Sequence, residues 1–368
     1  MNTGHLLSEI ISCLEDWAPP VYQESYDNSG LLTGDKAMMV HKALIALDCT
    51  EEVVDEAIHS GCQLIIAHHP VIFKGLKKLT GQSDVERTVI KAIRNNIALY
   101  ALHTNLDNVI TGVNMAIADR LGISALEPLE PRKETLCKLY VYVPVSHLDT
   151  VRDAVFAAGA GHIGNYDQAG FTVTGKGTFR GNEMTNPFLG KAGLREEVDE
   201  TRLEVIFPIH RTTEVHRALL SVHPYEEPAY DIVRLQNIQN TVGSGCIGIL
   251  QEAEEELDFL HRVKKTFSCP VIRHSPLRGK KVKRIAVCGG AGSFLIPRAL
   301  AAGADIFLTA DLKYHEFFQA ENRLILADLG HFESEQYTSD LIFQHISKKI
   351  PTFALLLSKT ITNPVKYL

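Results

Sequence analysis

The fold is decided by residues 42–70, which read KALIALDCTEEVVDEAIHSGCQLIIAHHP. The apolar runs near the two ends of this stretch have the length of buried strands. The segment between them is amphipathic, begins after Thr50, a residue that caps helix starts well, and ends at Gly61, a common helix stop. Strand, helix and strand in this order predict a right-handed βαβ unit within a parallel sheet.

The same kind of pattern continues on both sides of this unit. We expect helices over 5–17, 85–97 and 111–122, the last one capped by Thr111. A further apolar strand with a polar end is expected within 98–109. Alternating strands and helices of this length are typical of an α/β domain.

An internal similarity links the two outer parts of the chain. Residues 57–69 align with 299–311 at a constant offset of 242, and the same offset places 42–47 on 284–289. Strand, helix, glycine and strand then fall in register. We therefore predict two related α/β halves that form one domain. The alternative is that two ordinary βαβ units agree to this extent by chance.

Between these halves the pattern changes near Pro128. Strand, helix, strand, strand, helix and strand follow one another, with the first helix capped by Ser146. This βαββαβ order is that of a ferredoxin-like domain. The predicted organisation is thus a discontinuous α/β domain of residues 1–128 and 242–368 and an inserted ferredoxin-like domain of residues 129–241.

Composition narrows the class of protein. The formal net charge is −7, so the basic excess of nucleic-acid-binding proteins is absent and nucleic acid is not expected as a partner. The start of the chain lacks the basic region of a signal peptide, and no apolar run has the length of a membrane span. The seven cysteines form no C-x-x-C pair, which is typical of thiols in a reducing compartment, so we expect a cytoplasmic protein without membrane partners.

Histidines and carboxylates gather where strands are expected to end. The six residues are His68, His69, His103, Asp107, His331 and Glu335. His331 and Glu335 are four residues apart and would share one face of a helix. Parallel sheets bind ligands at the carboxyl edge of their strands, so these side chains should meet there.

Imidazole and carboxylate ligands together suit zinc, iron or manganese, and the lack of a thiolate argues against a structural zinc finger. The set is too large for one tetrahedral ion, whereas a dinuclear site bridged by a carboxylate accounts for it. Each residue alone has an ordinary structural alternative, so the prediction depends on their combination.

Two neighbouring segments are weaker candidates. In TADLKYHEF, Asp311, Lys313 and His315 either line the same cleft as acid, base or substrate contacts, or form a polar strand end. The glycine-rich CGGAGS, residues 288–293, is either a phosphate cradle at a helix start or a tight turn.

Four motifs together resemble one known family. AHHPVIF, LHTNLDN, TADLKYHEF and GHFESE are similar to the family of the NGG-one-interacting factor three, whose bacterial members are often named GTP cyclohydrolase 1 type 2 homologues. The resemblance covers nearly the whole chain. The segment HPYEEPAYD, residues 223–231, resembles the CutA/PII-type insert of the longer bacterial members.

The resemblance implies two divalent metal ions per chain and a toroidal homohexamer with the metal sites facing an internal cavity. The implied ligands are His68, His69, Asp107, His331 and Glu335, with Glu335 as the bridge. His103 is implied as a neighbour or a conditional ligand of the site.

The function expected from the resemblance is that of a metal-dependent hydrolase acting on a nucleotide or a related heterocycle, as in a GTP cyclohydrolase reaction. His103 or His315 would then shuttle protons. The alternative is a non-enzymatic, metal-containing hexamer that senses metals or small ligands, or that binds regulatory proteins.

Overall fold

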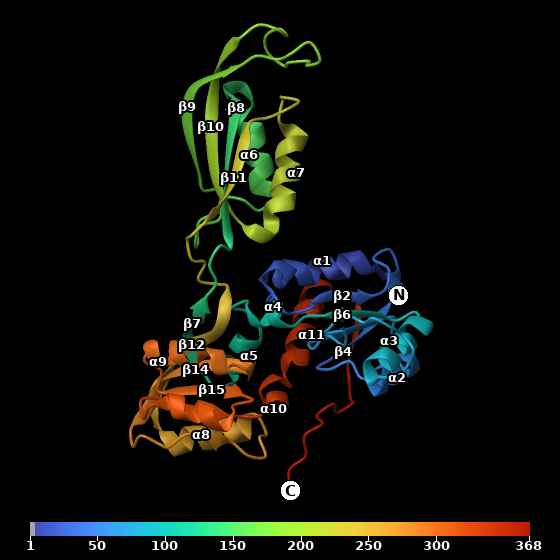
Figure 1. Cartoon of the computed structure of the whole chain (residues 1–368), viewed down its shortest axis with the longest axis vertical. Helices are drawn as coiled ribbons and strands as arrows, with labels where there is room; N and C mark the ends of the chain where they lie inside the picture. The colour runs from blue at the N-terminus through green and yellow to red at the C-terminus, as the bar shows by residue number, and fades with distance from the viewer. Residues whose placement is uncertain (1–3) are drawn as a thin grey trace. The chain divides into compact units, whose positions relative to one another are not determined.

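The computed structural model describes residues 4–368 and has a mixed α/β fold with several sheets (Figure 1). The chain forms two compact units. The first comprises Met1–Pro131 and Asn240–Leu368, and the second comprises Arg132–Gln239. Among the described residues, no helix is both long enough and apolar enough to span a bilayer.

The first half of the first unit is built on a five-stranded sheet in the order β17-β4-β5-β6-β2. Its neighbours pair in parallel except β2, which runs antiparallel to β6. The strands are β2 (Gly30–Thr33), β4 (Lys42–Ala46), β5 (Leu64–Ala67), β6 (Ala98–Ala101) and β17 (Ala354–Leu357). The helices of this half are α1 (Leu7–Trp17), α2 (Glu51–His59), α3 (Asp84–Arg94), α4 (Thr104–Asp107) and α11 (Thr338–Lys349).

The second half has a six-stranded sheet in the order β13-β16-β15-β14-β12-β7. Only β14, β15 and β16 pair in parallel. The strands are β7 (Ile123–Pro131), β12 (Gly243–Glu255), β13 (Arg273–His274), β14 (Lys281–Ala291), β15 (Ile306–Ala310) and β16 (Ile325–Asp328). The helices are α5 (Val113–Arg120), α8 (Glu256–Thr266), α9 (Ile296–Ala301) and α10 (His331–Glu335).

The two halves repeat one strand-pairing register. Ala43 of β4 lies opposite Leu64 of β5, and Ile285 of β14 lies opposite Ile306 of β15, which is the same pair displaced by 242 residues. The next two pairs along these strands show the same offset. Because register is set by the side chains that each strand buries, this agreement supports the prediction of two related halves.

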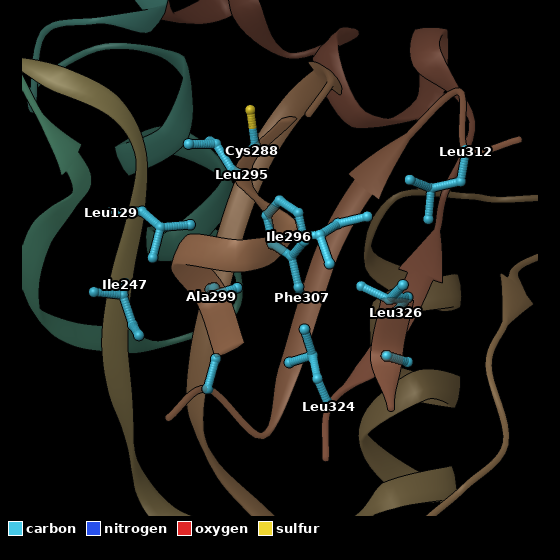
Figure 2. Packing of buried hydrophobic residues seen from close by; sticks show 13 residues of the cluster. Leu129, Ile247, Cys288, Leu295, Ile296, Ala299, Phe307, Leu312, Leu324 and Leu326 are labelled. Carbon is cyan, nitrogen blue, oxygen red and sulfur yellow. The ribbon is translucent and has the colours of Figure 1, made fainter. Parts of the chain in front are cut away.

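The core of the second half lies between α9 and its sheet (Figure 2). Ile296 and Ala299 on α9 belong to the same buried cluster as Phe307 of β15 and Leu326 of β16. Phe307 has no exposed surface and is among the largest fully buried side chains. The apolar runs from which the strands were expected thus form the packed interior.

The second unit has an antiparallel sheet in the order β11-β8-β10-β9 and two helices, α6 and α7. The helices lie against one face of the sheet (Figure 1). The elements are β8 (Leu136–Pro144), α6 (Leu148–Ala157), β9 (Gly170–Phe179), β10 (Glu196–Pro208), α7 (Thr212–Val222) and β11 (Tyr230–Leu235). Val141, Val151, Leu203 and Val215 form part of a separate hydrophobic core.

Of the three predicted helix caps, the one at Thr50 is confirmed, and those at Thr111 and Ser146 are wrong. The hydroxyl of Thr50 accepts a hydrogen bond from the backbone N–H of Val53, as expected. Thr111 does not cap α5, since its hydroxyl oxygen accepts a hydrogen bond from Nε1 of Trp17 at 3.0 Å. Ser146 does not cap α6, since its hydroxyl pairs with the ring of its neighbour His147 instead. In both cases another partner competes for the cap oxygen.

We expect the substitution Phe307→Ala to lower the free energy of unfolding of the first unit by about 3–5 kcal/mol, because it leaves a cavity in the core. Urea denaturation followed by the fluorescence of Trp17, the single tryptophan, reports on this unit. Phe318→Ala is the matched control, since that ring is 66% exposed and its loss should change stability by less than about 0.5 kcal/mol. Equal effects of the two substitutions would contradict this view of the core.

Candidate metal centre

The polar ends of two neighbouring strands meet helix α10 within the first unit. His68 and His69 directly follow β5, and Asp107 ends the short helix α4 that follows β6. The expected strand within 98–109 therefore stops at Ala101, and Asp107 is reached by a helical turn. One ligand-type atom from each of His68, His69 and Glu335 lies within 4.8 Å of the others, a cluster that could hold a metal ion.

The Glu335 carboxylate lies between two groups of side chains. Its Oε2 atom is 3.0 Å from Nε2 of His69 and 3.0 Å from Nε2 of His331. Its Oε1 atom is 3.8 Å from Nε2 of His68, which is itself 3.8 Å from Oδ1 of Asp107. The Glu335 carboxylate, which is only 3% exposed, thus lies next to all three implied histidine ligands, and Asp107 lies next to one of them, His68.

The His68 side has unsatisfied atoms that fit a cation. His68 has no exposed surface, and its Nδ1–H donates to the carbonyl oxygen of Leu102 at 2.7 Å. Its Nε2 atom therefore carries a lone pair, and it has no hydrogen-bond partner; the buried Oδ1 atom of Asp107 also lacks one. Burial lowers the pKa of His68, which favours the neutral, metal-binding form. A divalent ion between the two atoms would satisfy both.

Carboxylates hold the Nδ1 atoms of the other three histidines. Asp48 accepts from His69, Asp311 from His331 and Asp27 from His103, each at 2.7 Å. Such pairs fix the ring orientation and make the other nitrogen, Nε2, a better metal ligand. Sequence reasoning missed Asp48 and Asp27. Asp48 follows β4 as His69 follows β5. This position at a neighbouring strand end could have identified Asp48 from the sequence.

His103 lies beside the cluster. Its ring centroid is 5.4 Å from that of His68 and 5.5 Å from that of His69. Asp27 is partly buried, which opposes its ionisation, but hydrogen bonds from His103 and Thr104 lower its pKa. His103 is therefore anchored by an ionised carboxylate next to the candidate metal ligands.

The glycine-rich segment makes room for Glu335. Gly290 adopts a φ of +61°, and a Cβ atom there would lie 2.4 Å from Oε1 of Glu335 and 3.3 Å from Cε1 of His331. Its N–H donates to the hydroxyl of Ser334 at 3.0 Å, and its carbonyl accepts from Thr309. This segment therefore packs the end of β14 against α10.

The centre opens onto a cavity of about 840 Å³. Its walls include the metal-centre residues His69, His103, Asp107, His331 and Glu335. They also include aromatic side chains from separate segments, namely Tyr26, Phe73, Phe294, Phe332 and Tyr367. Thr362 lies nearby and donates its hydroxyl hydrogen to Oδ2 of Asp48. Residues around 362–367 thus form one wall and hold the carboxylate that orients His69.

The weaker candidates separate into two kinds. Asp311 lines the cavity and holds His331, so its place is that of a positioning residue. Lys313 and His315 are exposed and are not among the described residues that line the cavity. A catalytic role for these two residues stays a prediction.

Burial and the neighbouring charged groups shift the pKa values of the residues in the centre in opposite directions. Burial alone would lower the pKa of His69, but Asp48 and Glu335 raise it to about 9. For His331, burial is likewise outweighed by Asp311 and Glu335, which raise its pKa to about 11. Burial would raise the pKa of Glu335, but the surrounding histidines lower it. The buried carboxylate therefore demands positive charge, which protons supply when no metal ion does.

Comparison with known proteins agrees with these features. A family model described as Duf34/NIF3 (NGG1p interacting factor 3) matches residues 5–364. A Halalkalibacterium halodurans protein named "GTP cyclohydrolase 1 type 2 homolog" is 42% identical over 324 residues, which are 88% of this chain and 87% of that protein. A Bacillus subtilis protein of the same name is 35% identical over 370 residues, 98% of each chain. The crystal structure of a Bacillus cereus protein related to NIF3 superposes with a TM-score of 0.85, at 37% identity and over 100% of each chain.

We expect Gly290→Ala to weaken metal binding by about tenfold or more, because the new methyl group displaces an oriented carboxylate ligand. Gly303→Ala is the matched control: Gly303 has a similar φ of +68°, but a Cβ atom there meets nothing within 4 Å. Both substitutions carry the same kind of backbone strain, so they differ in the contacts with Glu335 and His331. Calorimetric titration with zinc checks this, and equal affinities of the two variants would contradict it.

Metal affinity should rise with pH between about 6 and 9, because protons on His69 and His331 compete with the ion below their raised pKa values. Burial lowers the pKa of His68, so this residue competes less for protons than His69 and His331 do. At neutral pH we therefore expect about one proton from each of His69 and His331 on metal loading. Titration calorimetry in two buffers of different ionisation enthalpy measures this number, and an affinity that does not change with pH would be inconsistent with the proton competition.

Proposed function

Because the chain belongs to the Duf34/NIF3 (NGG1p interacting factor 3) family, we propose that it binds two divalent metal ions per chain and acts as a metal-dependent hydrolase. One ion would be held by His68, Asp107 and Glu335. The other would be held by His69, His331 and Glu335. The position of the Glu335 carboxylate, with one oxygen toward each group, supports a bridging role.

The observation that carries the hydrolase proposal is that the metal centre opens onto a large cavity. A centre that only stabilised the fold would be closed and saturated by protein ligands, whereas a catalytic centre needs room for water and substrate. Zinc, iron and manganese all fit the nitrogen and oxygen ligands. Two such ions supply Lewis acidity and activate water for hydrolysis.

Side chains of the protein would orient the metal ligands and transfer protons. Asp48 and Asp311 fix the Nε2 atoms of His69 and His331 toward the centre by holding the opposite ring nitrogens. His103, held at Nδ1 by Asp27, has its Nε2 atom available to take up or return a proton. The names of the relatives suggest a nucleotide or a related heterocycle as the substrate.

A second proposal is a non-enzymatic metal-containing hexamer that senses small ligands or metals, or binds regulators. It is favoured by the second unit, whose strand order β11-β8-β10-β9 with two helices on one face fits a ferredoxin-like insert over residues 129–241. Light scattering tests the assembly. A hydrolysis screen of the metal-loaded protein separates the two proposals, because only the enzyme turns over a substrate.

We expect untagged wild-type protein to carry about two zinc, iron or manganese ions per chain, and Glu335→Ala to lose most of them, because both sites share that carboxylate. Elemental analysis of the purified proteins gives the count. Glu197→Ala in the second unit is the control, since this glutamate is exposed and pairs with Lys176. Stoichiometric metal in Glu335→Ala, or none in the wild type, would contradict the proposed centre.

A further inference from the structure

We propose that the cavity takes a flat, uncharged or cationic heterocycle that carries no phosphate groups, such as a base or nucleoside, rather than a nucleoside triphosphate. This inference rests on the proposed function, because it names the substrate class of the same centre. Three independent features of the cavity support it: its charge, the hydrogen bonds of its glycine-rich turn and its aromatic wall.

The charge of the cavity opposes anions. Seven carboxylates line it, from Glu24, Asp48, Asp107, Asp311, Asp328, Glu333 and Glu335. Arg273 is the only lysine or arginine among the described residues of the lining, and its guanidinium already pairs with Asp328 and with the carbonyl oxygen of Leu312. Among the described residues, no lysine or arginine forms an ion pair with five of the others, namely Asp48, Asp107, Asp311, Glu333 and Glu335. Two divalent ions would offset only four of these five negative charges.

A triphosphate would bring about four further negative charges into this cavity, and Coulomb repulsion at such separations costs far more than in bulk water. Besides metal ions, which neutralise only part of the charge here, proteins hold phosphates with arginine, lysine or free backbone N–H groups. Among the described residues of the lining, no unpaired cation serves this purpose.

The glycine-rich turn does not supply the missing donors. The N–H of Gly289 donates to Oδ1 of Asn114 at 3.0 Å, and that of Gly290 donates to the hydroxyl of Ser334 at 3.0 Å. The N–H of Gly292 donates to Oγ1 of Thr309 at 2.9 Å. These three N–H groups are therefore not free to bind a phosphate, which favours the tight-turn alternative for this segment.

The aromatic wall instead fits a flat ring. The Tyr26 and Phe73 ring centroids are 6.3 Å apart, and the Phe73 ring lies 6.1 Å from that of His103. His103 in turn lies 5.5 Å from His69 at the metal centre. Tyr26 is 62% exposed and Phe73 is 43% exposed, so both rings have surface available to a ligand. The faces of aromatic side chains stack on flat heterocycles of many kinds, and they also attract cations.

The test compares guanosine with GTP, which share one ring system and differ in the phosphates. The protein is the full chain loaded with zinc, and its metal content is measured first. We expect guanosine to bind at least about tenfold more tightly than GTP, because of the repulsion described above. We also expect Phe73→Ala to weaken guanosine binding by about tenfold through lost stacking.

Phe318→Ala is the matched control, because that exposed ring is not among the described residues of the cavity lining, and its loss should leave guanosine binding unchanged. Equal or tighter binding of GTP, no binding of guanosine, or an unaffected Phe73→Ala variant would overturn the inference. A chain without bound metal would instead contradict the proposed function. Comparing guanosine with GTP would still test the inference on the metal-free protein. Even without metal ions, carboxylates outnumber the cationic groups that line the cavity.

Discussion

The structure depends on one buried carboxylate that needs positive charge on both of its oxygen atoms. Glu335 is almost fully buried, and each of its oxygens faces histidine nitrogens from a different group. A buried carboxylate is tolerated only when it is paired or binds a metal ion. Gly290 is needed so that the backbone can approach this side chain, and Ser334, next to Glu335, anchors that glycine. The local sequence around Glu335 is thus explained by a single electrostatic constraint.

The strand-pairing register that the two halves share accounts for how such a centre is assembled. The offset of 242 residues places His69 and Asp311 at equivalent strand ends, and the structure uses one as a candidate ligand and the other as the carboxylate that holds His331. The third strands of the two halves, β6 and β16, are each followed after a short connection by a short helix, α4 or α10. Those helices carry Asp107 in one half and His331 with Glu335 in the other. Both halves therefore contribute to one site, with similar backbones and different side chains.

Sequence reasoning succeeded where local patterns decide the outcome. Apolar runs and the Thr50 cap gave the strands and helices of the βαβ units, and spacing alone placed His331 and Glu335 on one helix. It failed where a side chain chooses between partners that are distant in sequence. Thr111 accepts a hydrogen bond from Trp17 instead of capping its own helix. The role of Asp48 and Asp27 in orienting histidine rings can be recognised only in the folded chain, where they lie next to those rings. The role of Gly290 likewise depends on a contact with a residue 45 positions away.

Glu335 is proposed to bridge two metal ions in the wall of the cavity. Anomalous X-ray diffraction from crystals of the metal-loaded protein, recorded at the absorption edge of the bound metal, tests it most directly. The account predicts two anomalous peaks about 3.5–4 Å apart, the spacing typical of dinuclear hydrolase sites, with the Glu335 carboxylate between them. A single peak, or two peaks that do not share Glu335, would contradict it.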